Sequence, residues 1–183
     1  MIIAFAGKKG SGKSYYAHEL CIRGFFKASF ADQLKEAVKV IFGLSNDDVY
    51  NPDKKDTVIE KYNTTPRQLM QWLGTDILRK EFNKKFNYEW SIWVDNMKAL
   101  IQKTSNSNIV IDDVRFQNEV DMIHSLGGII IKIECDNEIK DNHESENQNV
   151  SYDYIIKNDK DNKKLTKSNI ELLCSLIDKW IFI

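Results

Sequence analysis

The sequence predicts an α/β fold in a single domain, residues 1–183, built on a parallel β-sheet. Short apolar runs alternate with amphipathic segments along the chain, which is the pattern of parallel strands joined by crossover helices. A glycine-rich loop at residues 7–14 lies directly between the first apolar run and the first helical segment. At 183 residues, the chain is long enough for one well-buried domain and short for two.

The first half of the chain divides into two strands, three helices and one irregular stretch. Thr65 is the expected N-cap of the third helix, with Pro66 at its first position and Gln68 closing a capping box. The predicted order is a strand at 2–6, a helix at 14–22, a strand at 25–30, a helix at 32–42 ended by Gly43, an irregular polar stretch at 45–63, and a helix from 66 whose apolar face carries Leu69, Leu73 and Ile77.

The second half continues the alternation of helices and strands. Residues 136–151 are rich in Asn, Asp and Glu, so they predict a polar excursion rather than a packed element. The predicted order is a helix at 91–103, a strand at 108–112, a helix at 116–126 stopped by Gly127, a strand at 129–134, the polar excursion, a strand at 154–156 and a closing helix at 165–180.

Composition narrows the compartment and the class of partner. The formal net charge is −1, so no overall basic field favours nucleic acid or an anionic membrane as a partner. No apolar run approaches the roughly 20 residues that span a bilayer. Three widely spaced cysteines suit a reducing compartment, and we expect a cytoplasmic protein in which they are buried as small hydrophobic residues: Cys21, Cys135 and Cys174.

The loop at residues 7–14 reads GKKGSGKS, a full G-x-x-x-x-G-K-[ST] phosphate-binding motif with a strand before it and a helix after it. Its backbone N–H groups and the following helix N-terminus are expected to hold phosphate oxygens. Lys13 is expected to reach the β- and γ-phosphates, and the Ser14 hydroxyl to bind Mg²⁺. The predicted nucleotide-binding residues are Gly7, Lys9, Gly10, Ser11, Gly12, Lys13, Ser14 and Tyr15.

A second acidic group is needed near the metal, and the apolar run at 109–111 ends in Asp112 and Asp113. Ligands of open α/β sheets gather at the carboxyl ends of the strands. Either aspartate is therefore a candidate metal ligand. The alternative is that one or both only cap the helix that follows.

Two classes of phosphate-loop protein compete at this point. A GTP-dependent switch generally carries an Asn-Lys-x-Asp element, and the nearest candidate, residues 158–161 (NDKD), has its lysine one place too late. The chain has only four arginines, and bidentate phosphate recognition favours arginine over lysine. Arg115 follows the acidic strand end, while Arg67, Gln71 and Thr75 predict a polar stripe opposite the apolar helix face. This placement favours a kinase of a small phosphorylated acceptor.

Four further segments follow the loop in the order found in a known family: residues 30–36 (FADQLKE), 65–76 (TPRQLMQWLGTD), 113–119 (DVRFQNE) and 143–146 (HESE). Together with the loop they resemble the deoxynucleoside monophosphate kinases of phages and large DNA viruses, over residues 1 to about 160. The resemblance implies ATP and Mg²⁺ as cofactors and a deoxynucleoside monophosphate as acceptor. It also implies a three-layer core, a helical acceptor-binding insertion at about 31–103 and a lid at about 136–151.

The resemblance also implies roles for individual residues. Asp32 and Lys35 would lie at the mouth of the acceptor site, and Arg115 would bridge the transferring phosphate. Asp113 matches the acid of the family motif and is preferred over Asp112. The acceptor site would be lined by Arg67, Gln71 and Asp76, with Trp72 a candidate to stack on a base, and the lid would carry Lys140, His143 and Glu146.

Two departures from the family pattern affect these expectations. The lid segment contains no arginine, so Lys13, Mg²⁺ and Arg115 would carry the transition-state charge unless Lys140 moves in. After Asn158 and Asp159 the chain lacks the glycine that relatives tend to have, which is expected to change only a turn. A kinase of another metabolite, of the phosphomevalonate or dephospho-coenzyme A type, stays open, as does a homodimer.

Overall fold

The computed structural model describes residues 1–88, 91–104, 107–135, 144, 149–159 and 163–181. The chain forms two compact units. Unit 1 consists of Met1–Ser29 and Lys98–Ile183, and unit 2 is the intervening Phe30–Met97.

Unit 1 is built on a five-stranded sheet with the order β2-β3-β1-β4-β5, in which all neighbouring strands are parallel. This confirms the predicted α/β class. The central strand, β1, is fully buried because helices cover both of its faces. The strands are β1 (Ile2–Ala6), β2 (Phe26–Ala28), β3 (Ile109–Val114), β4 (Ile129–Cys135) and β5 (Tyr154–Asn158).

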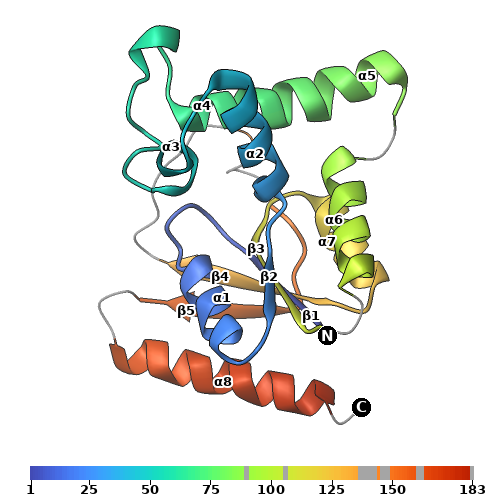
Figure 1. Ribbon diagram of the computed structural model, residues 1–183. Helices are drawn as coiled ribbons and strands as arrows, with labels where there is room; N and C mark the ends of the chain where they lie inside the picture. The colour runs from blue at the N-terminus through green and yellow to red at the C-terminus, as the bar shows by residue number, and fades with distance from the viewer. Residues whose placement is uncertain (89–90, 105–106, 136–143, 145–148, 160–162, 182–183) are drawn as a thin grey trace. The chain divides into compact units, whose positions relative to one another are not determined.

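Helices pack on both faces of this sheet (Figure 1). Helices α1 (Lys13–Ile22) and α8 (Lys163–Ile181) pack on the face that carries Ile3 and Phe5, where they share one core cluster. Helix α7 (Gln117–Ser125) packs on the opposite face, since the Ile123 side chain approaches Gly128 beside Ile2. The α1, α7 and α8 helices were all expected from the sequence, with ends within a few residues of the predicted ones.

Unit 2 is helical, with its own small core. Val38, Val49, Leu69 and Leu73 are buried together, and Ile77 packs against them. The elements are α2 (Ala31–Phe42), α3 (Asn46–Tyr50), the 3₁₀ turn η1 (Glu60–Tyr62), α4 (Pro66–Gln71), η2 (Trp72–Glu81) and α5 (Phe82–Phe86), while α6 (Ile92–Lys103) begins in this unit and ends in unit 1.

The prediction of an irregular stretch at 45–63 was wrong for its first part. Ser45 caps α3, because its hydroxyl accepts a hydrogen bond from the Asp48 amide while the Asp48 carboxylate accepts from the Ser45 amide. This is a capping box with aspartate in place of the usual glutamate. The helix is only five residues long, so its apolar periodicity was too short to recognise.

Elements α4, η2 and α5 form one continuous rod, Pro66 to Phe86, whose start has the predicted capping box: Thr65 accepts from the Gln68 amide, and Gln68 accepts from the Thr65 amide. Its middle part, Trp72–Glu81, is a π-helix, and the rod returns to α-helix at Phe82. Gly74 allows a close approach there, since a Cβ at this position would lie 2.5 Å from Leu34 Cδ2.

The buried indole of Trp93 donates to the Gly74 carbonyl at 3.0 Å, so this tryptophan is a core residue of unit 2. Cys135 is buried as expected, whereas Cys21 and Cys174 are half-buried. Among the helices of the described residues, none has the length and apolar character that a membrane span requires.

Candidate active site

The phosphate loop lies at the point where the strand order of the sheet reverses. Strand β1 lies between β3 and β4, and its last residue, Ala6, is paired with Val114 on one side and Lys132 on the other. The chain passes from β1 to β2 and β3 on one side of the central strand, and then to β4 and β5 on the other side. Such a switch point is where open parallel sheets bind their ligands.

The loop needs glycine at positions where a side chain would collide. Gly7 has φ of 139°, and a Cβ there would lie 2.4 Å from the Ile133 carbonyl oxygen. Gly12 has φ of 107°, and a Cβ there would lie 2.4 Å from the Asn158 side-chain nitrogen. These two glycines therefore let the loop pass close to the ends of β4 and β5. Ser11 is buried within it, and its Oγ atom has no hydrogen-bond partner among the described residues.

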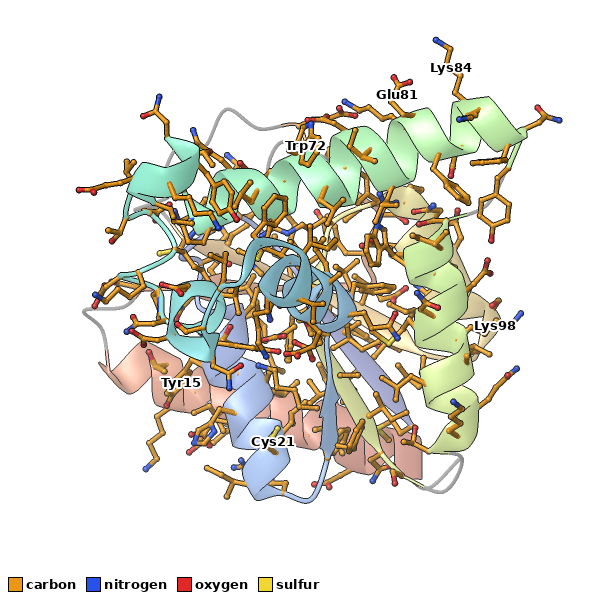
Figure 2. The ribbon with its side chains drawn as sticks, turned by 45° about the horizontal axis from the view of Figure 1, so that its top comes forward. Tyr15, Cys21, Trp72, Glu81, Lys84 and Lys98 are labelled. Carbon is orange, nitrogen blue, oxygen red and sulfur yellow. The ribbon has the colours of Figure 1, made fainter. Side chains whose placement is uncertain are left out.

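The side chain of Lys13 folds back over the loop. Its Nζ atom donates to the carbonyl of Gly7 at 2.6 Å and to that of Lys8 at 2.7 Å. The residue is only 8% exposed, so a cation is held against a loop that phosphate oxygens would approach. Ser14 and Tyr15 lie in the first turn of α1 and are exposed, and Figure 2 shows Tyr15 on that helix. Lys9 and Gly10 lie in the loop itself.

Both aspartates lie inside β3, so the alternative that they cap the following helix was wrong. Asp112 is buried and forms an ion pair with Lys27 of the neighbouring strand at 2.8 Å. Asp113 Oδ2 accepts a hydrogen bond from the Ser29 hydroxyl at 2.6 Å. The two carboxylates are thus held by different residues, Lys27 within β2 and Ser29 just after it, which the sequence did not predict.

Arg115 directly follows β3, and a buried carboxylate holds its backbone in place. Glu119 is 2% exposed, and one of its carboxylate oxygens accepts from the amides of Arg115 (2.8 Å) and Phe116 (3.1 Å). An anion at the N-terminus of α7 is favoured by the helix dipole. Glu119 therefore fixes the direction in which the chain carries Arg115, and it is a supporting residue that sequence reasoning did not single out.

In unit 2, the two residues expected at the mouth of the acceptor site pair with each other. Lys35 Nζ lies 2.9 Å from Asp32 Oδ1 and 4.6 Å from the ring centre of Tyr50. The Tyr50 hydroxyl donates to Glu36. Burial, with the negative charge of Asp32 nearby, raises the pKa of Tyr50 to about 12, so the phenol stays a hydrogen-bond donor at neutral pH.

The predicted acceptor residues of the rod have varied surroundings. Arg67 forms an ion pair with Asp56, with 2.6 Å between Nε and Oδ1. Asp76 forms a long, exposed pair with Lys80 at 3.4 Å. Trp72 is 48% exposed and projects from η2 (Figure 2), whereas Gln71 is half-buried.

The predicted polar stripe was wrong at Thr75, which is 6% exposed. The prediction placed Thr75 on the face of the helix opposite Leu73, but Thr75 is buried together with Leu73 and Gly74. Tertiary packing around Gly74, which Leu34 approaches closely, decides which side of this element is covered. The predicted lid residues Lys140, His143 and Glu146 lie outside the described residues.

Comparison with known proteins identifies the family. The family model described as deoxynucleotide monophosphate kinase matches residues 49–169. The chain belongs to the deoxynucleotide monophosphate kinase family. It is 37% identical over 175 residues to a protein of Acanthamoeba polyphaga mimivirus named "Putative deoxynucleotide monophosphate kinase", covering 87% of this chain and 89% of the relative. The chain is accordingly a kinase that acts on deoxynucleoside monophosphates.

Comparison with a solved structure supports the fold of the chain, and only the fold. The crystal structure of TT1252 from Thermus thermophilus aligns with 98% of this chain and 97% of its own, with a TM-score of 0.51 and 14% sequence identity. The TM-score supports a shared α/β architecture, whereas sequence identity this low carries no information about the substrate.

Proposed function

We propose that this deoxynucleotide monophosphate kinase uses ATP with Mg²⁺ and transfers the γ-phosphoryl group to the 5′-phosphate of its acceptor, giving a deoxynucleoside diphosphate and ADP. The observation that supports this most is the loop after β1. Gly7 and Gly12 are required by close approaches to neighbouring strands, and Lys13 is held over the loop carbonyls. The family match favours this function over the phosphomevalonate, dephospho-coenzyme A and GTP-switch alternatives.

The donor phosphates would be held by the loop and the start of α1. Backbone N–H groups of residues 8–14 would bind phosphate oxygens, with the positive end of α1 behind them. Lys13 would exchange its contacts with the Gly7 and Lys8 carbonyls for contacts with the β- and γ-phosphates. The Ser11 hydroxyl, which has no hydrogen-bond partner in the part of the chain that the structure describes, offers one more donor to the phosphates.

The residues present fit Mg²⁺ bound together with a nucleotide. Among the described residues no group of three or more His, Cys, Asp or Glu side chains could hold a metal by itself. Mg²⁺ usually keeps several waters and binds through one or two protein oxygens plus substrate phosphates, so a small protein contribution is expected. We propose the Ser14 hydroxyl as the direct ligand and Asp113 as the acceptor for metal-bound water. When bound, the ion would neutralise phosphate charge.

Asp112 is the weaker candidate for that role, because its buried carboxylate is already neutralised by Lys27. Arg115 would contribute a bidentate contact to the transferring phosphoryl group. Transfer between two phosphates needs little proton abstraction, so positioning and charge neutralisation account for catalysis. Glu119 would act through the backbone of Arg115 and would not touch the substrate.

Unit 2 would supply the acceptor-binding region, and the two units together would form one kinase domain. Arg67 is the proposed contact for the acceptor phosphate, with Asp56 orienting its guanidinium. Gln71, Trp72 and Asp76 would contact the nucleoside, with Asp32 and Lys35 at the mouth of the site. The segment at 136–151 would serve as the lid, with Lys140, His143 and Glu146 its polar residues.

The test is a coupled ADP-release assay with ATP and Mg²⁺ against a panel of deoxy- and ribonucleoside monophosphates, with phosphomevalonate and dephospho-coenzyme A as controls. Turnover with one or more deoxynucleotides, lost when EDTA is added, is the expected result. Turnover only with a control metabolite would overturn the proposed acceptor. Binding of GTP and GDP with slow hydrolysis and no transfer would instead indicate a switch.

The proposed partners are free nucleotides in the cytoplasm, without nucleic acid or membrane. The near-neutral charge of the chain supports this, since nucleic-acid binding relies on basic surfaces. A homodimer is part of the proposal only as a state to be measured, by light scattering across a range of protein concentrations.

A further inference from the structure

A series of buried hydrogen bonds in unit 1 ends at the phosphate loop. Asn158, the last residue of β5, donates from Nδ2 to the carbonyl of Ser11 at 2.8 Å. Its Oδ1 accepts from the Tyr16 hydroxyl at 3.1 Å. The Tyr16 oxygen accepts in turn from Asn169 of α8 at 3.1 Å, and Asn169 also donates to the Lys157 carbonyl at 2.8 Å.

These partners determine which way the Asn158 amide faces. The Ser11 carbonyl can only accept, so it requires the NH₂ group of the amide. The Tyr16 hydroxyl receives a hydrogen bond from Asn169 and gives its own proton to Asn158 Oδ1. Burial raises the pKa of Tyr16, so the phenol remains protonated and keeps donating. The donor and the acceptor of each of these hydrogen bonds are therefore fixed.

The same amide also packs against the next residue of the loop. A Cβ at Gly12 would lie 2.4 Å from Asn158 Nδ2, so the amide occupies the space that any other residue at position 12 would need. Asn158 thus contacts two successive loop residues, one by a hydrogen bond and one by packing. Both precede Lys13, whose position depends on the path of the loop.

We propose that Asn158 is a positioning residue for nucleotide binding, which holds the Ser11–Gly12 peptide so that the loop N–H groups point at the donor phosphates. A carbonyl that is tied back by a side chain cannot rotate toward the phosphate site, where its negative end would repel the ligand. Tyr16 and Asn169 keep the amide of Asn158 in the required orientation. This inference rests on the proposed use of ATP.

The chain offers a matched control. Asn169 has the same side chain as Asn158, and both are 8% exposed within the same hydrogen-bonded group. Asn169 contacts Tyr16 and the Lys157 backbone, whereas Asn158 contacts the loop itself. Loss of either amide should lower the melting temperature by a similar amount, because each removes buried hydrogen bonds. Only the loss of Asn158 should act directly on the loop.

The experiment measures ATP and ADP binding by isothermal titration calorimetry, with melting temperature recorded for every variant. Asn158→Ala should weaken ATP binding about tenfold, because it removes one hydrogen bond to the loop and lets the Ser11–Gly12 peptide rotate. Asn158→Asp, which is isosteric but carries an anion and no NH₂ donor, should weaken it on the order of a hundredfold. Asn169→Ala should change the affinity less than about threefold. Tyr16→Phe should fall between the Asn158→Ala and Asn169→Ala results.

The order of affinities decides the outcome. If Asn158→Ala and Asn169→Ala lower affinity equally at equal loss of melting temperature, Asn158 has only a stabilising role and the inference is wrong. If Asn158→Asp is folded and binds ATP as tightly as wild type, the inference is also wrong while the proposed kinase function stands. If the wild-type chain transfers phosphate from a donor other than ATP and binds no ATP, both proposals fail. Kinetics give a second reading, since KM for ATP should rise in the Asn158 variants while KM for the deoxynucleotide stays constant.

Discussion

The phosphate loop of unit 1 and the long rod of unit 2 are each predicted by a local sequence motif. They differ in how much of the structure that motif determines. In the loop, two of the three glycines are required by a contact with a distant part of the chain: Gly7 with Ile133 and Gly12 with Asn158. In the rod, the capping box at Thr65 and Gln68 sets the start, and the helix then changes type six residues later at Trp72.

The difference lies in what fixes the spacing of functional residues. A loop that wraps phosphate has its spacing set by the ligand, so the same motif appears wherever the chemistry is needed. A stripe of side chains on a helix has its spacing set by the helix geometry, and that geometry depends on tertiary packing. The phosphate-binding motif therefore lies between β1 and α1 as its sequence context predicts, whereas Thr75 is buried with Leu73 and Gly74.

The largest effect is expected from Lys13→Ala. This change removes the cation held over the Gly7 and Lys8 carbonyls and should lower kcat/KM by about a thousandfold. Lys8→Ala, which removes an exposed lysine of the same loop, should cost less than about tenfold. Steady-state ADP release with melting temperatures provides the measurement. Equal losses in the two variants would mean that overall loop charge matters rather than the position of Lys13.

Arg115→Lys should have the next largest effect. A point charge replaces the bidentate guanidinium, so kcat should fall about a hundredfold with little change in either KM. Arg23→Lys is the control, because Arg23 is exposed and pairs with the nearby Glu19 at 3.1 Å, and it should leave kcat unchanged. A rise in the acceptor KM with constant kcat would assign Arg115 to substrate binding instead of charge stabilisation.

Arg67→Ala tests the rod. Loss of the proposed phosphate contact should raise the acceptor KM about tenfold and leave KM for ATP constant. Asp56→Ala removes the partner of Arg67 but leaves the positive charge of Arg67 in place. It should raise the acceptor KM less than about threefold. If both variants raise it equally, the Arg67–Asp56 pair acts as a unit that shapes the helix start.

The smallest effect is expected from Thr65→Ala. Loss of the N-cap should lower the free energy of unfolding by about 1 kcal/mol without changing either KM. Thr64→Ala is the control, because the Thr64 hydroxyl only donates to the Gln68 side chain, and it should cost about half as much. Urea denaturation measures both. A raised acceptor KM in the Thr65 variant would show that the start of the rod also positions Arg67.

Sequence reasoning recovered those features that rest on local signals or on a pattern of alternating elements. The five strands and the helices α1, α2, α4, α6, α7 and α8 were all expected, because each has caps, glycine stops or apolar periodicity long enough to recognise. The helix α3 and the π-helix η2 were not, since one is very short and the other depends on contacts such as Leu34 with Gly74.

The supporting residues of the site were the main omission. Asp112 is held by Lys27, Asp113 by Ser29, and the backbone of Arg115 by Glu119. Lys27 and Ser29 lie outside every recognised motif, and Glu119 lies in a motif whose aspartate and arginine attracted the functional interpretation. Asn158 was considered only as a departure that changes a turn, whereas its amide contacts Ser11 and Gly12. Its signal in the sequence is an asparagine at the end of an apolar strand, which suggests a buried amide only when the partner strand is known.

The order of the sheet has a consequence for how this protein behaves at high concentration. Strands β2 and β5 form its two edges, and an unpaired edge can template sheet growth between molecules. Strand β2 is only three residues long with Lys27 at its centre, and β5 carries the exposed Lys157 near its end. A second molecule that extended the sheet would have to pair backbone beside these charged side chains. Self-association by strand addition is therefore disfavoured, and any dimer is expected to use helical surfaces.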